Sequence, residues 1–190
     1  MVDLREIAKK ALEQMPPEAR FSPEDAQVIA RHKDLLLSWS EEFVQAFYDT
    51  LFAHPPTRAV FREGERPERE ETLRGWWRRT VEGPLDETYF AWMAKVGLVH
   101  VYRKVENPMM LAMADFAVGF VGARASSMGL VELAVAFNRL MGSLRAVIAY
   151  GYDFFQKLAL HNVVGMEPAL LDRLSLEEAR SFLGKLKERG

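Results

Sequence analysis

Histidine is the side chain in this sequence best suited to bind a metal, because the chain contains no cysteine. The histidines are His32, His54, His100 and His161. None of them has a second histidine or a glutamate at the helical spacing of a zinc hydrolase (H-E-x-x-H) or a di-iron bundle (Glu-x-x-His). A glycine-rich phosphate loop and a G-x-S-x-G nucleophile turn are also absent from the sequence. The residues therefore give no support to zinc hydrolase, di-iron, thiolate or nucleotide-binding chemistry.

His100 differs from the other histidines in its surroundings. It shares one helical stripe with Tyr89, Met93 and Val96, the spacing that places side chains on the same face. A buried imidazole must find a partner for both ring nitrogens, and either a hydrogen bond in the core or a heme iron would serve. Arg103 follows on the same face, where it could reach the carboxylates of a heme. The other three histidines stand beside charged or helix-ending residues, which indicates surface or capping roles.

Helical periodicity runs through most of the chain, without the alternating pattern of strands. The clearest helix start is Ser22, a natural N-cap followed by Pro23 and two acidic residues. Asp86 is the predicted cap of the helix that carries His100, and Asn107 is the predicted cap of the next one. The predicted helices cover about 4–14, 22–37, 40–53, 58–61, 68–82, 87–104, 107–127 and 131–162, with a small last one opened at 175–178. About eight helices with short connections predict an all-α fold.

Composition limits the partners and the compartment. A length of 190 residues suits one domain, and a net charge of −2 gives no reason to expect nucleic acid or an anionic membrane as a partner. The first ten residues carry Asp3 and Glu6 and lack the apolar run of a signal peptide, so we expect a cytoplasmic protein. The apolar stretch 108–123 contains Asp115 and is short for a membrane span, so we expect a buried core helix. The scarcity of asparagine and glutamine beside 25 basic and 27 acidic residues is typical of a thermophile.

Four short segments together resemble one family. Residues 43–51 (FVQAFYDTL) are similar to the A-F-Y-x-x-L pattern of the second helix of protoglobins and globin-coupled sensors, which supplies the distal tyrosine. Residues 96–100 (VGLVH) are similar to the V-G-x-x-H motif of that family, whose histidine is the proximal iron ligand. Residues 70–73 resemble its distal helix, and residues 86–90 resemble the acidic opening of its proximal helix. The order and the spacing of these segments match the family over about residues 22–162.

The resemblance implies an all-α, globin-like fold with an extra N-terminal helix and a short C-terminal helix. It implies a single globin domain over 1–190, with a core at about 22–162 and extensions at 1–21 and 163–190. It also implies one b-type heme, held noncovalently because the sequence has no C-x-x-C-H motif, with His100 as the iron ligand. The residues expected to contact the heme or its ligand are Phe47, Tyr48, Arg69, Thr72, Leu73, Trp76, Met93, Val96 and Arg103. The implied function is reversible binding of O₂, CO or NO.

The sequence departs from the family pattern on the proximal side. One extra residue precedes Pro108, and Met110 and Leu111 stand where tryptophan and tyrosine are common. About 25 residues follow Gly165, so we expect a single-domain protoglobin without a transmitter domain. Trp76 and Trp77 are adjacent and cannot both face one heme, so either one could be the contact.

Assembly and activity leave further expectations. The segments 107–127 and 131–162 are long, apolar and rich in small residues, and relatives pair through them, so we expect a homodimer. A heme enzyme, such as an NO dioxygenase or a peroxidase, is one alternative to a gas-binding protein, and it would need an external electron donor. A heme-free globin fold that acts as a regulatory interaction module is the other alternative, because a fold does not fix a function.

Overall fold

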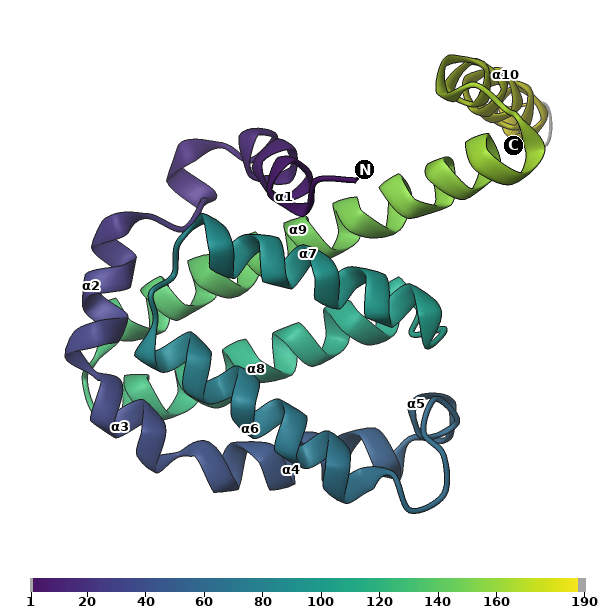
Figure 1. The fold of residues 1–190 in the computed structure, drawn as a ribbon. Helices are drawn as coiled ribbons and strands as arrows, with labels where there is room; N and C mark the ends of the chain where they lie inside the picture. The colour runs from purple at the N-terminus through teal and green to yellow at the C-terminus, as the bar shows by residue number, and fades with distance from the viewer. Residues whose placement is uncertain (1, 188–190) are drawn as a thin grey trace. The chain divides into compact units, whose positions relative to one another are not determined.

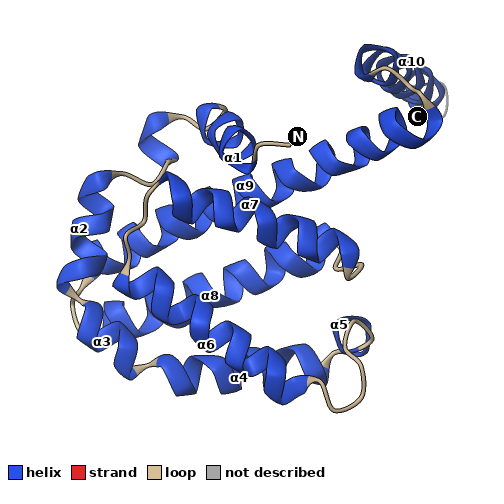
Figure 2. Cartoon of the chain, viewed as in Figure 1, coloured by secondary structure: helices blue, strands red, loops and turns tan. Residues whose placement is uncertain are grey.

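The computed structural model describes residues 2–187, which form helices joined by short connections (Figures 1 and 2). The first helices are α1 (Leu4–Glu13), α2 (Pro23–Arg31), α3 (Lys33–Ser38), α4 (Ser40–Ala53) and α5 (Pro55–Arg58). They are followed by α6 (Arg66–Glu82), α7 (Glu87–Tyr102), α8 (Asn107–Ser127), α9 (Val131–Ala159) and α10 (Pro168–Lys187). No strand occurs among residues 2–187, so the predicted all-α class is confirmed.

Side-chain caps fix several helix starts where the sequence placed them. The Ser22 hydroxyl accepts from the Asp25 N–H, and the Asp25 carboxylate accepts from the Ser22 N–H, which makes a capping box at α2. The Asp86 carboxylate accepts from the Tyr89 N–H at 3.0 Å and caps α7. The N-cap of α8 is Glu106 rather than the predicted Asn107, which lies one residue inside the helix.

Three predicted helix bounds are wrong. The helix predicted over 22–37 is two helices, because the chain leaves helical geometry at His32, whose Nδ1 lies 2.9 Å from the Val28 carbonyl oxygen. The short helix predicted at 58–61 lies earlier, at Pro55–Arg58, where two prolines occupy the first turn and need no N–H partner. The last helix begins at Pro168 rather than near residue 175, for the same reason.

The described chain divides into two compact units, Met1–Gly151 and Tyr152–Gly190, and the boundary lies inside α9. The predicted globin core extended beyond this boundary, to about residue 162. In the second unit, Lys157 and Asp172 form an ion pair at 2.8 Å between the end of α9 and α10. The π-helical turn Leu160–Val164 joins these two helices.

The core of the first unit is built around Trp77 of α6, which is fully buried. Its ring stacks on Phe43 of α4 with a centroid separation of 4.3 Å. Its indole N–H donates to the Leu36 carbonyl of α3 at 2.9 Å, so the one polar atom of the ring is satisfied. Phe137 of α9 packs against the same ring at 5.9 Å. One side chain thereby joins four helices around a common core.

Helices α6 and α7 follow each other in the chain and are joined by residues 83–86. At their connected end, the hydroxyls of Thr80 and Tyr89 lie 2.8 Å apart, and both side chains are fully buried. In Figure 1 the two helices diverge from this end, towards the start of α6 and the end of α7. Helix α4 packs along α6, and α1 packs along α7. The site described below lies between the diverging helices.

Helix α8 buries one face only. Met110, Ala114, Ala117 and Val121 are buried, while Leu111 on the other face is 40% exposed. The expectation of a buried core helix is therefore corrected, since only 28% of its most apolar stretch is buried. By length and composition α8 is the one helix among the described residues that could cross a membrane, a property shared with core helices of soluble proteins.

Candidate functional site

A cavity of about 480 Å³ lies in the first unit, between α4, α6, α7, α8 and α9. Its walls are largely apolar, and they include a group of methionines from α8 and α9 (Met109, Met110, Met113 and Met141). All the residues predicted from the sequence to contact a heme line this one cavity: Phe47, Tyr48, Arg69, Thr72, Leu73, Trp76, Met93, Val96, His100 and Arg103. The fold thus brings them together, while their roles toward a heme stay predictions.

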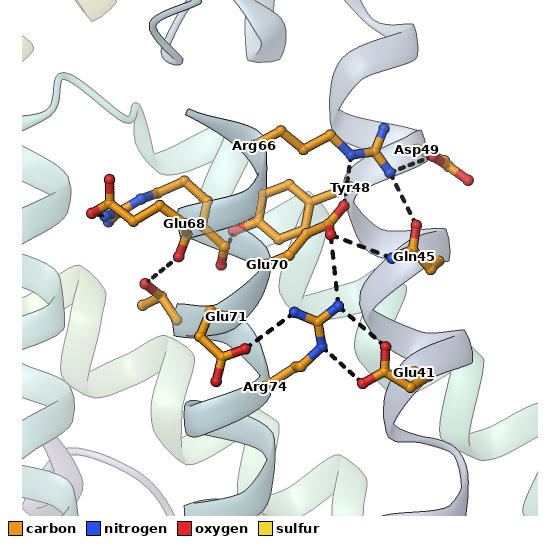
Figure 3. A network of polar contacts seen from close by, with 11 residues as sticks. Glu41, Gln45, Tyr48, Asp49, Arg66, Glu68, Glu70, Glu71 and Arg74 are labelled. Carbon is orange, nitrogen blue, oxygen red and sulfur yellow. Dashed lines mark hydrogen bonds and ion pairs between the residues drawn. The ribbon is translucent and has the colours of Figure 1, made fainter. Parts of the chain in front are cut away.

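An ion-pair network holds α4 and α6, the two helices that carry Tyr48 and Thr72 (Figure 3). Arg74 of α6 contacts the Glu41 carboxylate of α4 at 2.8 and 3.1 Å. Arg66 of α6 contacts Asp49 of α4 at 2.6 Å. Glu70, with a side chain only 13% exposed, lies between the two arginines and contacts both, at 2.7 and 3.7 Å. A network of ion pairs stabilises the fold more than an isolated surface pair does, and this one fixes the spacing of α4 and α6.

Both hydroxyls predicted to face a gas ligand are engaged with backbone carbonyls. The Tyr48 hydroxyl donates to the Arg69 carbonyl at 2.8 Å (Figure 3), and the Thr72 hydroxyl donates to the Glu68 carbonyl at 3.0 Å. Burial raises the pKa of Tyr48 to about 12, so the phenol is neutral and keeps its proton. Each hydroxyl must turn away from its carbonyl before it can donate to a ligand in the cavity.

The two adjacent tryptophans have different positions. Trp76 lines the cavity, whereas Trp77 points into the core and donates to Leu36. Of the two tryptophans, Trp76 is therefore the one that lines the cavity, and its contact with a heme stays a prediction. The angular step of about 100° between successive residues of a helix accounts for the separation.

His100 lines the cavity from α7 as a neutral imidazole. Burial, followed by the charge of Arg103, lowers its pKa to about 4. Its Nδ1 is buried and has no hydrogen-bond partner in the described part of the chain. A buried nitrogen without a partner is costly, so no hydrogen bond at Nδ1 explains the burial of this ring as a satisfied core histidine. Neutral imidazole is also the form that ligates metals.

Gly97 sets how closely α7 lies against α9. A Cβ atom at this position would lie 3.3 Å from the Ile148 carbonyl oxygen and 3.4 Å from its Cα. Both are backbone atoms of α9, so a side chain here would push the two helices apart. His100 follows Gly97 by three residues, and the depth of the histidine in the cavity therefore depends on this close approach.

The charged side chains around the cavity are all basic. Arg69, Lys95, Arg103 and Arg145 line it, and no aspartate or glutamate does so among the residues described. An apolar chamber with cations around it suits an apolar ligand that carries anionic groups. Lys95 and Arg145 were not predicted from the sequence, although Lys95 lies on the same helix as His100. Val60 and Phe61 were not predicted either; they line the cavity from the connection after α5 and belong to no periodic segment.

The described residues form no site for a metal ion that depends on the protein for three or more of its ligands. No group of three histidine, aspartate or glutamate side chains converges in the described chain, and His100 is the one such side chain that lines the cavity. One protein ligand is enough only for a metal that brings its other ligands with it.

Comparison with known proteins adds one finding. The sequence model of the protoglobin family matches residues 9–123, from α1 into α8, and so takes in α4, α6 and α7. No curated protein matches the chain significantly. The α9 part of the cavity wall lies outside the matched segment.

Proposed function

Because the chain belongs to the protoglobin family of globin-type, heme-dependent gas-binding proteins, we propose that its cavity holds one b-type heme ligated by His100. The resemblance seen in the motifs is confirmed at the family level by the match over residues 9–123. The proposed ligands are O₂, CO or NO, bound reversibly.

The neutral His100 ring carries this proposal. It lies on an apolar wall, and no other histidine, aspartate or glutamate lines the cavity among the described residues. This donor set fits a metal that is already held in a macrocycle, and heme iron is such a metal. The heme would supply the iron centre at which the gas binds. The chain would supply His100 on one side and the hydroxyls of Tyr48 and Thr72 on the other.

The remaining residues would orient the heme and exclude water. Phe47, Leu73 and Val96 offer apolar surface to the ring, and the low polarity of the wall strengthens any hydrogen bond formed inside. Arg69 and Arg103 would pair with the propionates, because guanidinium groups bind carboxylates through two parallel hydrogen bonds.

We also propose that the protein is a cytoplasmic homodimer that pairs through α8 and the segment 131–162. The outward face of α8 supports this pairing: it carries Ala112, Gly119 and Ala123, all exposed, and small residues let helices approach closely. The amino-acid bias supports an origin in a thermophile.

Absorption spectra of purified protein, ferric, ferrous and with CO, test the proposal. We expect a Soret band in the wild type and a large loss of bound heme in His100→Ala, because the chain's bond to the iron is removed. His54→Ala is the matched control and should bind heme normally, since His54 lies at the end of α4 and is not among the residues that line the cavity.

Two outcomes would contradict the assignment. An unchanged five-coordinate ferrous spectrum in His100→Ala would show that another group holds the iron. A wild type that never acquires a Soret band would favour the heme-free interaction module instead.

A further inference from the structure

Glu65 places a carboxylate between the two arginines assigned to the heme propionates. Its Oε1 lies 2.7 Å from a terminal nitrogen of Arg103 and 3.3 Å from Nε of Arg69. Its Oε2 accepts from the backbone N–H of Arg62 at 2.9 Å. The side chain is only 10% exposed, although Glu65 is the N-cap residue just before the first turn of α6. The position of this carboxylate is therefore fixed from both sides.

This contact joins the free ends of the α6–α7 pair. Arg69 belongs to α6, and Arg103 stands at the end of α7, three residues after His100. Arg103 also reaches the connection after α5, with 3.5 Å to the Val60 carbonyl oxygen and 5.9 Å to the centre of the Phe61 ring. Since these residues all line the cavity, Glu65 closes its edge by ion pairs.

The opposite end of the same helix pair is closed differently. Thr80 and Tyr89 are fully buried there, next to the covalent connection 83–86. Arg69 and Arg103 are 21% and 22% exposed, so a carboxylate from outside can reach them, whereas breaking the fully buried hydrogen bond leaves unsatisfied groups. The end held by Glu65 is therefore the one at which the pair can open.

We propose that Glu65 is a latch that occupies the carboxylate site of the empty protein and yields Arg69 and Arg103 to the carboxylates of an incoming porphyrin. The proposal rests on the heme function above and adds a residue that controls entry. Arg69 and Arg103 are two guanidinium groups, and each can pair with one carboxylate of a ligand that carries two. The exchange replaces one charge-assisted contact by another, so no arginine is left unpaired in the cavity.

Glu68 provides a matched control. It also contacts the guanidinium group of Arg69, but its side chain is 72% exposed and has no contact with Arg103 among the described interactions. Glu68→Gln therefore removes a carboxylate from the same arginine without opening the latch. The glutamine of Glu65→Gln keeps the size of the side chain and removes its charge.

The experiment follows the uptake of metal-free protoporphyrin IX from detergent micelles by stopped-flow fluorescence. A porphyrin without iron separates carboxylate recognition from ligation by His100. The dimethyl ester of the same porphyrin keeps the ring and lacks both negative charges. We expect Glu65→Gln to take up the diacid about 3- to 10-fold faster than the wild type, since the one carboxylate that competes for both arginines is gone. Relative to the wild type, uptake of the diester by Glu65→Gln should change by less than about twofold, and so should uptake of the diacid by Glu68→Gln.

Three results would overturn the latch. Equal diacid uptake by Glu65→Gln and the wild type would show that Glu65 does not compete with the ligand. Equal acceleration of diacid and diester would show that the substitution only loosens the edge. A wild type that takes up neither porphyrin but gains a Soret band with heme would overturn the latch alone, whereas a wild type that takes up no heme either would overturn both proposals, so the two failures are distinguishable. Glu65→Asp, too short to span both arginines, should give an intermediate diacid rate and serves if Glu65→Gln does not fold.

Discussion

The contact between α7 and α9 at Gly97 makes a quantitative prediction. In Gly97→Ala the added Cβ would lie 3.3 Å from the Ile148 carbonyl oxygen, which is tighter than nine in ten real contacts of this kind. The neighbouring atoms belong to the backbone of a long helix and cannot move alone. The substitution must therefore separate α7 from α9 by a few tenths of an ångström.

Two opposing effects set the magnitude. Alanine is a better helix former than glycine by about 0.5–1 kcal/mol. Overpacking a close contact costs about 1–3 kcal/mol. We expect a net loss of about 0.5–2 kcal/mol in the free energy of unfolding of heme-free Gly97→Ala. Gly75, in the middle of α6, has nothing within 4 Å of its added Cβ, so Gly75→Ala is the matched control and should gain about 0.5–1 kcal/mol.

Urea unfolding of both variants measures the difference, and heme titration measures its consequence for the site. His100 lies on the displaced part of α7, so Gly97→Ala should bind heme more weakly than the wild type, while Gly75→Ala should bind it equally well. If Gly97→Ala were stabilised as much as Gly75→Ala, the close approach would not be tight, and the argument that Gly97 positions the histidine would be refuted.

Three further predictions concern other parts of the molecule. Tyr48→Phe should release O₂ from the heme-loaded protein about 3- to 10-fold faster and change CO release by less than about threefold. The expected effect on O₂ is modest, because the Tyr48 hydroxyl must first leave the Arg69 carbonyl before it can donate to the gas. Unchanged stopped-flow release rates for both gases would contradict this role of Tyr48. The pairing with Arg103 lowers the pKa of Glu65 to about 2, so the stabilisation from this carboxylate is complete above about pH 4.5 and is lost as the pH falls through 2. The stability of Glu65→Gln should therefore depend less on pH in this window than that of the wild type. Identical acid-unfolding curves for the two proteins would count against the pairing. Sedimentation of the wild type should give a dimer that buries more than about 1,000 Å², and Gly119→Arg should give a monomer that keeps its heme, whereas a wild-type monomer at tens of micromolar would disprove the assembly.

Local signals in the sequence predicted helix starts better than helix continuity. Ser22 and Asp86 cap their helices as expected, because the capping bonds are made within three residues of the chain. The break at His32 carries no such signal, since neither glycine nor proline marks it. A periodic pattern continues through a change of helix direction when both pieces bury the same side, as Ile29 and Leu36 do.

The cavity wall was predictable where it follows helical periodicity. Met93, Val96 and His100 share a face of α7, and the spacing alone places them together. Glu65 was not predictable in this way, because its partners lie on two helices and become neighbours only when the helices pack. Arg145 was missed for a similar reason, since it reaches the cavity from α9, far from the motifs along the chain.

The α6–α7 pair therefore unites stability and access in one element. Its connected end is held by a hydrogen bond between two fully buried hydroxyls, a bond whose loss would strand polar atoms in the core. Its free end is held by ion pairs to Arg69 and Arg103, which are about one fifth exposed, so salt and competing carboxylates can reach the two arginines. Arg103, which holds Glu65, stands three residues after His100 at the end of α7. A movement of this end of α7 would therefore move both side chains together. Opening at Glu65 would thus expose the side of the cavity that carries His100, the proposed iron ligand.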